Sequence, residues 1–223
     1  HGSNELINNL EIDYDPQSIN GYKNIIVDND ILLDCEQIAT GTYTPIKGFM
    51  NSSELNSVLE KMKLPNGVIW TMPIILQLRK DDYDDLTVGE TIILTDVNDI
   101  PYAKLVVEEL YKIDLNITTK KWFCTNSDDH PGVSRMKNKG NLIVAGEITL
   151  LRLTPSNYQE YKLTPRQTRF VFFKKGWSRI VGFHTRNIIH SAHEYIQKHA
   201  MEKVYADGIL ISPVVGQKKR GDF

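Results

Sequence analysis

Residues 178–215 constrain the fold of this chain more than any other stretch, because two apolar segments flank a helical pattern. Residues 180–183 (Ile-Val-Gly-Phe) and residues 208–215 are each apolar enough for a strand buried on both faces. The spacing between them is that of one helical face, at Ile189, His193, Ile196, Ala200 and Val204. Strand, helix and strand within about 40 residues predict a βαβ unit with two parallel strands.

A polar turn, His184-Thr185-Arg186-Asn187, ends the first of these predicted strands. Asn187 is a good helix cap, so we expect the helix to begin directly after it. In βαβ units, ligands bind at the carboxyl end of the first strand, where free backbone N–H groups and the positive end of the helix dipole attract an anion. The sequence therefore predicts an anion site at this turn.

The side chains at and after the turn suit phosphoryl chemistry. Arg186 offers a planar fork of donors for a tetrahedral oxyanion and stays charged at any physiological pH. His190 and His193 are three residues apart, so they are predicted to share one face of the first helical turn. A zinc site built from these histidines with His184 and Glu194 is disfavoured, because the spacing matches no familiar zinc motif and the arginine would repel a cation. We expect no metal ligands here.

The motif His-Thr-Arg-Asn-x-x-His-x-x-His resembles the Gln-Thr-Arg-Asn-x-x-His-x-x-His signature of the ATP sulfurylase (sulfate adenylyltransferase) family. Other family landmarks follow the family's order at residues 44–51 (Thr-Pro-Ile-Lys-Gly-Phe-Met-Asn), 129–132 (Asp-His-Pro-Gly) and 163–169 (Leu-Thr-Pro-Arg-Gln-Thr-Arg). The resemblance covers most of the chain from about Asp34 onward. His184 stands where the family usually has Gln.

The resemblance implies transfer of AMP from ATP to sulfate, giving adenylyl sulfate and pyrophosphate. It implies sulfate binding by His184 and Arg186, and ATP binding by His184, Thr185, Arg186 and Asn187. The implied catalytic residues are Thr185, Arg186, Asn187, His190 and His193. No resident cofactor is implied, and Mg²⁺ is expected only with ATP. Two alternatives stay open: a nucleotidyltransferase with a different oxyanion acceptor, and a non-catalytic nucleotide- or RNA-binding module.

The pattern of elements predicts two domains, an α+β domain over residues 1–160 and the start of an α/β domain over residues 161–223. The resemblance implies a β-rich, PUA-like barrel followed by the N-terminal part of a Rossmann-like nucleotidyltransferase domain. The family's later segments are absent from the sequence, so we read it as a fragment with weak or no turnover by itself.

Local patterns predict the remaining elements. Residues 5–30 are expected to form a peripheral lead-in, while the acidic run 81–85 and residues 126–135 are expected to be loops. Ser52 or Ser53 is predicted to cap a helix over residues 54–62, and a second helix is predicted over residues 166–175, ending at Gly176. Strands are predicted at residues 68–78 (interrupted at Pro73), 91–94, 102–107 and 141–153, with a bulge or close packing at Gly146.

Composition limits the partners. A formal charge of −2 and a pI near 6.3 give no general attraction to nucleic acid or to an anionic membrane. The sequence has no secretion signal and no apolar run near the roughly 18 residues of a membrane span, so we expect a cytoplasmic protein. The expected partners are ATP and sulfate, and a homo-oligomer is compatible with the sequence. The basic loop at residues 216–222 is either a solvated loop or an aid to phosphate binding.

Overall fold

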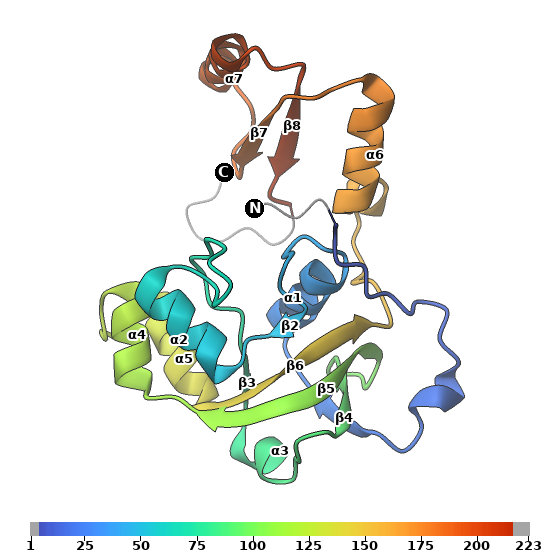
Figure 1. The fold of residues 1–223 in the computed structure, drawn as a ribbon, viewed down its shortest axis with the longest axis vertical. Coiled ribbons are helices and arrows are strands. Elements are labelled where there is room, and N and C mark those ends of the chain that lie inside the picture. The colour runs from blue at the N-terminus through green and yellow to red at the C-terminus, as the bar shows by residue number, and fades with distance from the viewer. Residues whose placement is uncertain (1–4, 216–223) are drawn as a thin grey trace. The chain divides into compact units, whose positions relative to one another are not determined.

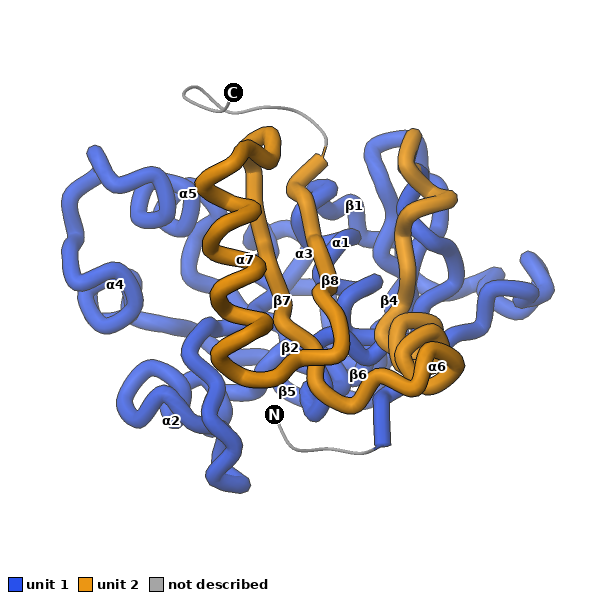
Figure 2. Tube along the Cα trace, turned by 90° about the horizontal axis from the view of Figure 1, so that it is seen from above, with its two compact units in different colours: residues 1–155 blue, residues 156–223 orange. Residues whose placement is uncertain are grey.

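The computed structural model describes residues 5–215, which fall into two compact units (Figure 1). Unit 1 comprises residues 1–155 and unit 2 comprises residues 156–223, and Figure 2 colours them separately. The basic loop considered at residues 216–222 lies outside the described residues. Within the described part of the chain, no helix has the length and apolar character needed to cross a membrane.

Unit 1 is built on a mixed six-stranded sheet in the order β1-β4-β5-β6-β2, with β3 also paired to β6. The strands are β1 (Lys23–Ile26), β2 (Gly48–Phe49), β3 (Leu76–Leu78), β4 (Thr91–Thr95), β5 (Pro101–Lys112) and β6 (Leu142–Leu150). The β1–β4 pair is parallel, and the other pairs are antiparallel. Strand β6 therefore has three partners, and it runs through the middle of the unit (Figure 1).

Gly146 lets the backbones of β2, β5 and β6 approach one another closely. A Cβ atom at Gly146 would lie 1.9 Å from the carbonyl oxygen of Val106 in β5. A Cβ atom at Gly48 in β2 would lie 1.8 Å from the carbonyl oxygen of Gly146. Neither contact leaves room for a side chain, because backbone atoms cannot move aside without breaking the ladder. The close packing predicted at Gly146 is confirmed, and the neighbouring bulge lies in β5, between Val107 and Glu109.

Helices accompany the sheet of unit 1, and the sequence analysis missed two of them. They are the 3-10 turn η1 (Pro16–Ile19) and α1 (Asn29–Ala39), α2 (Ser52–Lys61), α3 (Lys80–Asp84), α4 (Leu115–Phe123) and α5 (Pro131–Lys139). The missed α1 begins at Asp28, whose carboxylate accepts a hydrogen bond from the Ile31 amide at 3.0 Å. The prediction of a peripheral lead-in over residues 5–30 is wrong, because β1 joins the sheet and fully buries Ile25.

Capping residues explain the other differences. Asn51, not Ser52 or Ser53, caps α2: its side chain accepts from the Glu54 amide at 2.9 Å, and the Glu54 carboxylate accepts from the Asn51 amide at 3.1 Å. The predicted loop at residues 126–135 contains the start of α5, where His130 Nδ1 accepts from the Gly132 amide at 3.2 Å.

Two further boundaries differ from those predicted. Most of the acidic run 81–85 belongs to the short helix α3 rather than to a loop, although much of it is exposed as expected. The predicted strand at residues 68–78 is reduced to β3. Pro73 supplies no amide hydrogen for a ladder, so the chain pairs with β6 only beyond it.

The core of unit 1 lies between the sheet and its helices. Its fully buried side chains include Ile25, Ile38, Met50, Leu76, Ile92, Leu94, Leu105, Ile143, Ile148 and Leu150. Glu36 of α1 is also buried, with 3% of its surface exposed, and it accepts hydrogen bonds from the amide (2.8 Å) and the hydroxyl of Thr154. This pairing satisfies a buried carboxylate and ties α1 to the chain just after β6.

Asp34 on α1 makes the stability of unit 1 depend on pH. Burial raises its pKa to about 6, from an ordinary value of 3.8, against the opposing effect of a 3.3 Å hydrogen bond from the Tyr43 hydroxyl. A raised pKa favours the protonated acid in the folded state. This contribution to stability is complete below pH 3.8 and is lost as the pH rises to 6.

We therefore expect Asp34→Asn to stabilise the chain at neutral pH by on the order of 2 kcal/mol, since each pKa unit is worth about 1.4 kcal/mol before discounting for partial exposure. Below the unfolded pKa the gain should vanish. Urea unfolding at several pH values measures this difference. Tyr43→Phe removes the opposing hydrogen bond and should move the transition to higher pH. An equal effect of Asp34→Asn at acidic and neutral pH would contradict the assignment.

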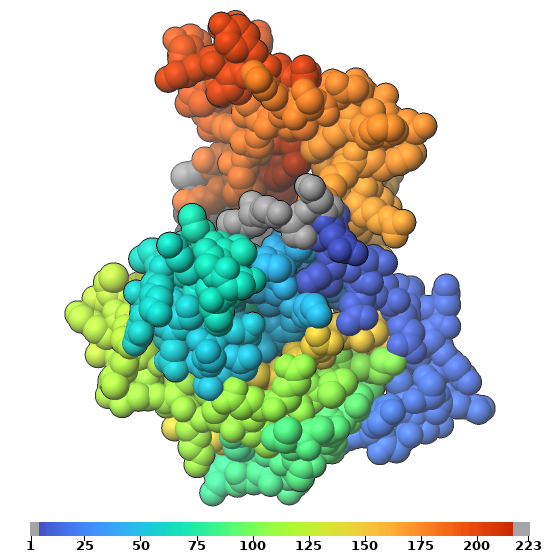
Figure 3. All heavy atoms as spheres, in the orientation of Figure 1, coloured from blue at the N-terminus to red at the C-terminus, as the bar shows by residue number. Residues whose placement is uncertain are grey.

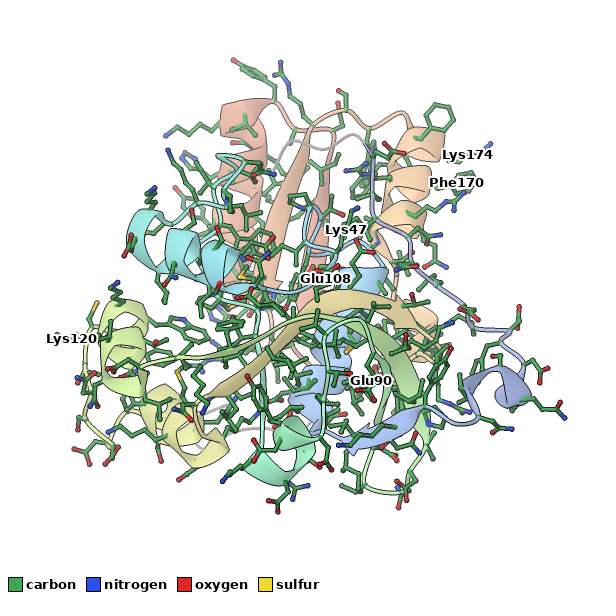
Figure 4. All side chains as sticks on the ribbon, turned by 60° about the horizontal axis from the view of Figure 1, so that its bottom comes forward. Lys47, Glu90, Glu108, Lys120, Phe170 and Lys174 are labelled. Carbon is green, nitrogen blue, oxygen red and sulfur yellow. The ribbon has the colours of Figure 1, made fainter. Side chains whose placement is uncertain are left out.

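Unit 2 contains the predicted βαβ unit. Its elements are η2 (Gln159–Tyr161), α6 (Pro165–Lys175), β7 (Ile180–Thr185), α7 (Ser191–Val204) and β8 (Gly208–Pro213). Strands β7 and β8 are parallel, with Ile180 opposite Gly208 and Thr185 opposite Pro213, which confirms the prediction. The predicted helix ending at Gly176 is confirmed as α6. On α6 the Lys174 ammonium lies 5.4 Å from the ring centre of Phe170 (Figure 4).

Candidate functional site

The polar turn at the carboxyl end of β7 is held by its own hydrogen bonds. The Thr185 hydroxyl accepts from the Asn187 amide at 3.0 Å and donates to the Asn187 carbonyl at 3.1 Å. The Thr185 carbonyl accepts from the Val214 amide at 2.8 Å, which extends the pairing with β8. Thr185 is buried, whereas His184, Arg186 and Asn187 are exposed. Thr185 therefore shapes the turn from within, and its neighbours face solvent.

The helix after the turn begins later than predicted. Asn187 is not its cap: α7 starts at Ser191, and His190 occupies the cap position with an extended backbone and no side-chain cap bond. The hydroxyl of Thr185 engages the backbone of Asn187 in a compact turn, and the chain needs three more residues to reach the helix. The amide groups of the first turn of α7 consequently follow His190 directly.

The structure brings the two predicted histidines together despite the later helix start. The rings of His190 and His193 stack with their centroids 3.9 Å apart at an interplanar angle of 30°. Phe183 of β7 meets His193 edge-on, with centroids 5.5 Å apart. The His193 ring is therefore in contact with strand β7 and with the cap residue of α7. Stacking on two sides fixes the position of this ring better than a surface histidine's.

The buried face of α7 differs from the predicted one. Ile196 is 54% exposed and Val204 is 49% exposed, whereas Gln197 is only 9% exposed. Tyr195 lies on the exposed side of the helix at the top of the space-filling view (Figure 3). Sequence reasoning missed Gln197 because a polar residue was not considered for the inner face. Its spacing of four residues from His193 was the available signal.

The opposite end of the βαβ unit is fixed by Asp207. One carboxylate oxygen accepts from the Ser178 amide (2.7 Å), the Ser178 hydroxyl (3.0 Å) and the Arg179 amide (2.8 Å). These hydrogen bonds, with the Arg179 amide first, hold the pKa of Asp207 below its usual range. Next to it, Gly208 faces Trp177, whose ring would lie 2.4 Å from an added Cβ atom. The starts of β7 and β8 are thus joined, which keeps the register that places the turn at their other ends.

Unit 1 has a separate depression of about 270 Å³ beside β2 and β6. It belongs to the segment containing the landmark at residues 44–51 and combines Lys47 with Glu54, Glu108 and Glu147, of which Lys47 and Glu108 are labelled in Figure 4. Partial burial, followed by the neighbouring carboxylates, raises the pKa of Glu108. Acidic walls of this kind repel phosphate and sulfate, so this depression does not compete with the turn for an anion.

The described residues contain no group of three or more His, Cys, Asp or Glu side chains placed to hold a metal ion. The same part of the chain has two free cysteines, with Cys35 buried and Cys124 exposed. The chemistry available at the turn is therefore that of hydrogen-bond donors and charge: a guanidinium, exposed amide groups at a helix start and two stacked imidazoles. This set of groups can bind and polarise an oxyanion.

Comparison with known protein families matches both units in order. The family described as PUA-like domain matches residues 2–153, and the family described as ATP-sulfurylase matches residues 159–223. A structure titled "Hexameric APS kinase from Thiobacillus denitrificans" shares the fold with a TM-score of 0.73 at 22% identity, covering 97% of this chain and 40% of that one. The fold of unit 1 is accordingly PUA-like, with a mixed sheet and helices.

Relatives named sulfate adenylyltransferase match nearly the whole chain. The protein from Thermococcus onnurineus (strain NA1) is 40% identical over 202 residues, and that from Pyrococcus abyssi (strain GE5 / Orsay) is 39% identical, each covering 91% of this chain and 52% of the relative. The Persephonella marina (strain DSM 14350 / EX-H1) protein is 39% identical over 90% of this chain and 52% of its own length. The chain spans about half the length of these curated relatives. With both family matches in order along it, this chain belongs to the ATP-sulfurylase family.

Proposed function

We propose that this chain supplies the adenylyl-transfer site of a sulfate adenylyltransferase. The observation that carries the proposal is the strand–turn–helix of unit 2, in which Arg186 lies in the turn between β7 and the stacked pair of His190 and His193. The relatives' printed name supports the same assignment.

The proposed reaction joins a sulfate oxygen to the α-phosphorus of ATP. The bond between that phosphorus and the oxygen bridging to the β-phosphate breaks, and its electron pair leaves with pyrophosphate. The enzyme forms no covalent bond, so catalysis depends on positioning and on stabilising charge. Mg²⁺ arrives with ATP as part of the substrate and neutralises charge on the phosphates.

Each residue of the turn has a proposed part in this reaction. Arg186 and His184 bind sulfate, while Asn187 and the backbone of the turn that Thr185 braces contact the nucleotide. His190 and His193 donate hydrogen bonds to the α-phosphoryl oxygens and to the departing pyrophosphate. The guanidinium suits sulfate because two parallel N–H groups match two oxygens of a tetrahedral anion.

The acceptor is the part of the proposal that this sequence leaves most open, because His184 replaces the usual Gln. In β7 His184 lies opposite Ser212 of β8 and is exposed, so it can meet an anion at the strand end. A neutral imidazole donates one hydrogen bond, as one amide N–H does, and a protonated one adds charge. A nucleotidyltransferase with a different oxyanion acceptor is therefore the second candidate function.

Pyrophosphate release by the full-length protein that contains this chain distinguishes the two candidates. We expect release from ATP to depend on sulfate and to exceed release with phosphate by at least about tenfold. Selenate, with sulfate's shape and charge, serves as the positive control. His184→Gln should keep this order of preference. Preference for phosphate would favour the second candidate, and release independent of any oxyanion would overturn both.

The architecture extends the proposal. Unit 1, over residues 1–160, would form a PUA-like barrel, and residues 161–223 would begin a Rossmann-like nucleotidyltransferase domain. Support for a larger second domain comes from its apolar side chains: Ile188 is 81% exposed, and Phe173 and Tyr205 are exposed as well. Such surfaces suit coverage by further protein in a full-length enzyme or in a homo-oligomer.

A further inference from the structure

Two buried polar atoms on α7 are left without partners. Among the described residues, the Nδ1 atom of His193 and the Nε2 atom of Gln197 are shielded from solvent and have no hydrogen-bond partner. Gln197 is the one buried residue of α7, at 9% exposure. Leaving a buried polar group unpaired costs about 1–3 kcal/mol, so the two atoms call for an explanation in common.

Their positions allow them to serve one another. Residues 193 and 197 are separated by four positions and lie one above the other on the same face of an α-helix. The His193 ring is confined by Phe183 at 5.5 Å and by His190 at 3.9 Å. The glutamine side chain is long and flexible, whereas the ring is held, so the amide is the group that adjusts.

The chemistry of the pair determines where the proton on His193 resides. The glutamine Nε2 is a donor only, and an imidazole nitrogen accepts a hydrogen bond only when it carries no proton. The two atoms can pair only if the neutral His193 ring has its hydrogen on Nε2. The opposite tautomer would set two N–H groups against each other in a buried place.

We propose that Gln197 is a positioning residue that donates its Nε2 hydrogen to Nδ1 of His193 and fixes the tautomer protonated at Nε2. His193 then offers an N–H donor at Nε2 even when it is uncharged. An oxyanion substrate would meet a donor at that nitrogen, not a lone pair, and His193 would act by stabilising charge and not as a base. This last consequence rests on the proposed function, whereas the tautomer itself does not.

Nitrogen-15 NMR of the histidine side chains tests the tautomer in this 223-residue chain. Spectra recorded at about pH 9, well above the ordinary pKa of imidazole, distinguish a protonated ring nitrogen from a bare one. We expect His193 to carry its hydrogen on Nε2. Gln197→Met keeps the length and removes the donor, and it should shift His193 to a mixture of tautomers. A hydrogen on Nδ1 in the unmodified chain would overturn the proposal, as would an unchanged tautomer in Gln197→Met.

Two further variants guard against a merely structural effect. Gln197→Glu replaces the donor with an acceptor and should move the hydrogen of His193 to Nδ1, the reverse of the native tautomer. Lys198→Leu changes the neighbouring exposed position, where Lys198 pairs with Glu194 at 2.6 Å, and should leave His193 as it is. If Gln197→Met disturbs the amide signals of β7 and β8, the native spectrum and the Gln197→Glu spectrum still decide.

Kinetics of the full-length protein separate this inference from the proposed function. If both hold, Gln197→Met lowers kcat about tenfold or more and changes the KM for ATP little, because a donor used in the transition state is lost while binding persists. If no adenylyl transfer to sulfate is found at all, the proposed function fails and the tautomer result stands. An unchanged kcat in an active enzyme would refute the catalytic consequence.

Discussion

Gly146→Ala is expected to destabilise unit 1 by at least about 3 kcal/mol, more than an ordinary overpacked core position. The added Cβ atom would lie 1.9 Å from the Val106 carbonyl oxygen, 2.9 Å from its carbon and 3.1 Å from the Leu105 side chain. Backbone atoms of a paired strand cannot rotate away as a side chain can. Relief therefore requires β5 and β6 to separate, and these strands pair along the whole of β6. Thermal unfolding with hydrogen exchange of residues 142–150 measures the loss.

Gly182→Ala provides the matched control, because Gly182 also lies within a strand and an added Cβ atom there would meet nothing within 4 Å. We expect a change within about 0.5 kcal/mol, in line with substitutions that neither strain the backbone nor fill space. A Gly146→Ala protein that unfolded at the same temperature as the parent chain would show that the three backbones do not pack as closely as described. Poor folding of the variant beside a well-folded control would agree with the expected clash.

Arg186→Ala is expected to reduce sulfate-dependent adenylyl transfer by the full-length protein at least about 100-fold, the loss typical of removing one charge-stabilising donor. The side chain is exposed in the turn after β7, on the loop that the Thr185–Asn187 hydrogen bonds hold in place. Alanine removes both the charge and the fork of donors. Lysine keeps the charge and loses the fork, so Arg186→Lys should fall between the two. Initial rates at saturating ATP and varied sulfate measure the effect.

Arg179→Ala removes a second exposed arginine of unit 2 and serves as the control. Its guanidinium donates to the Val204 carbonyl at 3.3 Å, at the end of α7 away from the turn. We expect at most a few-fold change in rate, because a solvent-exposed contact of this kind adds little. Retention of more than half the activity by Arg186→Ala would remove the turn from the reaction. ATP binding unaffected by Arg186→Ala, together with tight RNA binding at physiological salt, would instead favour a binding module.

Local patterns in the sequence were sufficient for the elements whose signals lie within a few residues. The Thr164-Pro165 start and the Gly176 end predicted α6, because capping and positive φ are properties of short segments. The alternation of apolar runs predicted the parallel pair of β7 and β8, and the motif after residue 183 located the candidate site. His190 and His193 meet as expected, since three residues of separation bring them together even across the helix cap.

Choices among competing caps and partners could not be made from local patterns. Asn51 displaced Ser52 and Ser53 as a cap because Glu54 reaches back only to its amide. Helix α1 was hidden by a mixture of polar and apolar residues, and its buried Glu36 is acceptable only because Thr154, distant in sequence, donates to it. Such residues look surface-like until their partners are known.

The sequence by itself determined the family, the βαβ unit and the residues of the anion-binding turn, because each depends on residue types at short and regular spacings. Tertiary structure alone decided where α7 begins, which of its faces is buried and that Gln197 lies inward beside His193. The physical reason is that a helix buries whichever face its neighbouring strands cover, even when that face carries a glutamine and a more apolar stripe is left in solvent.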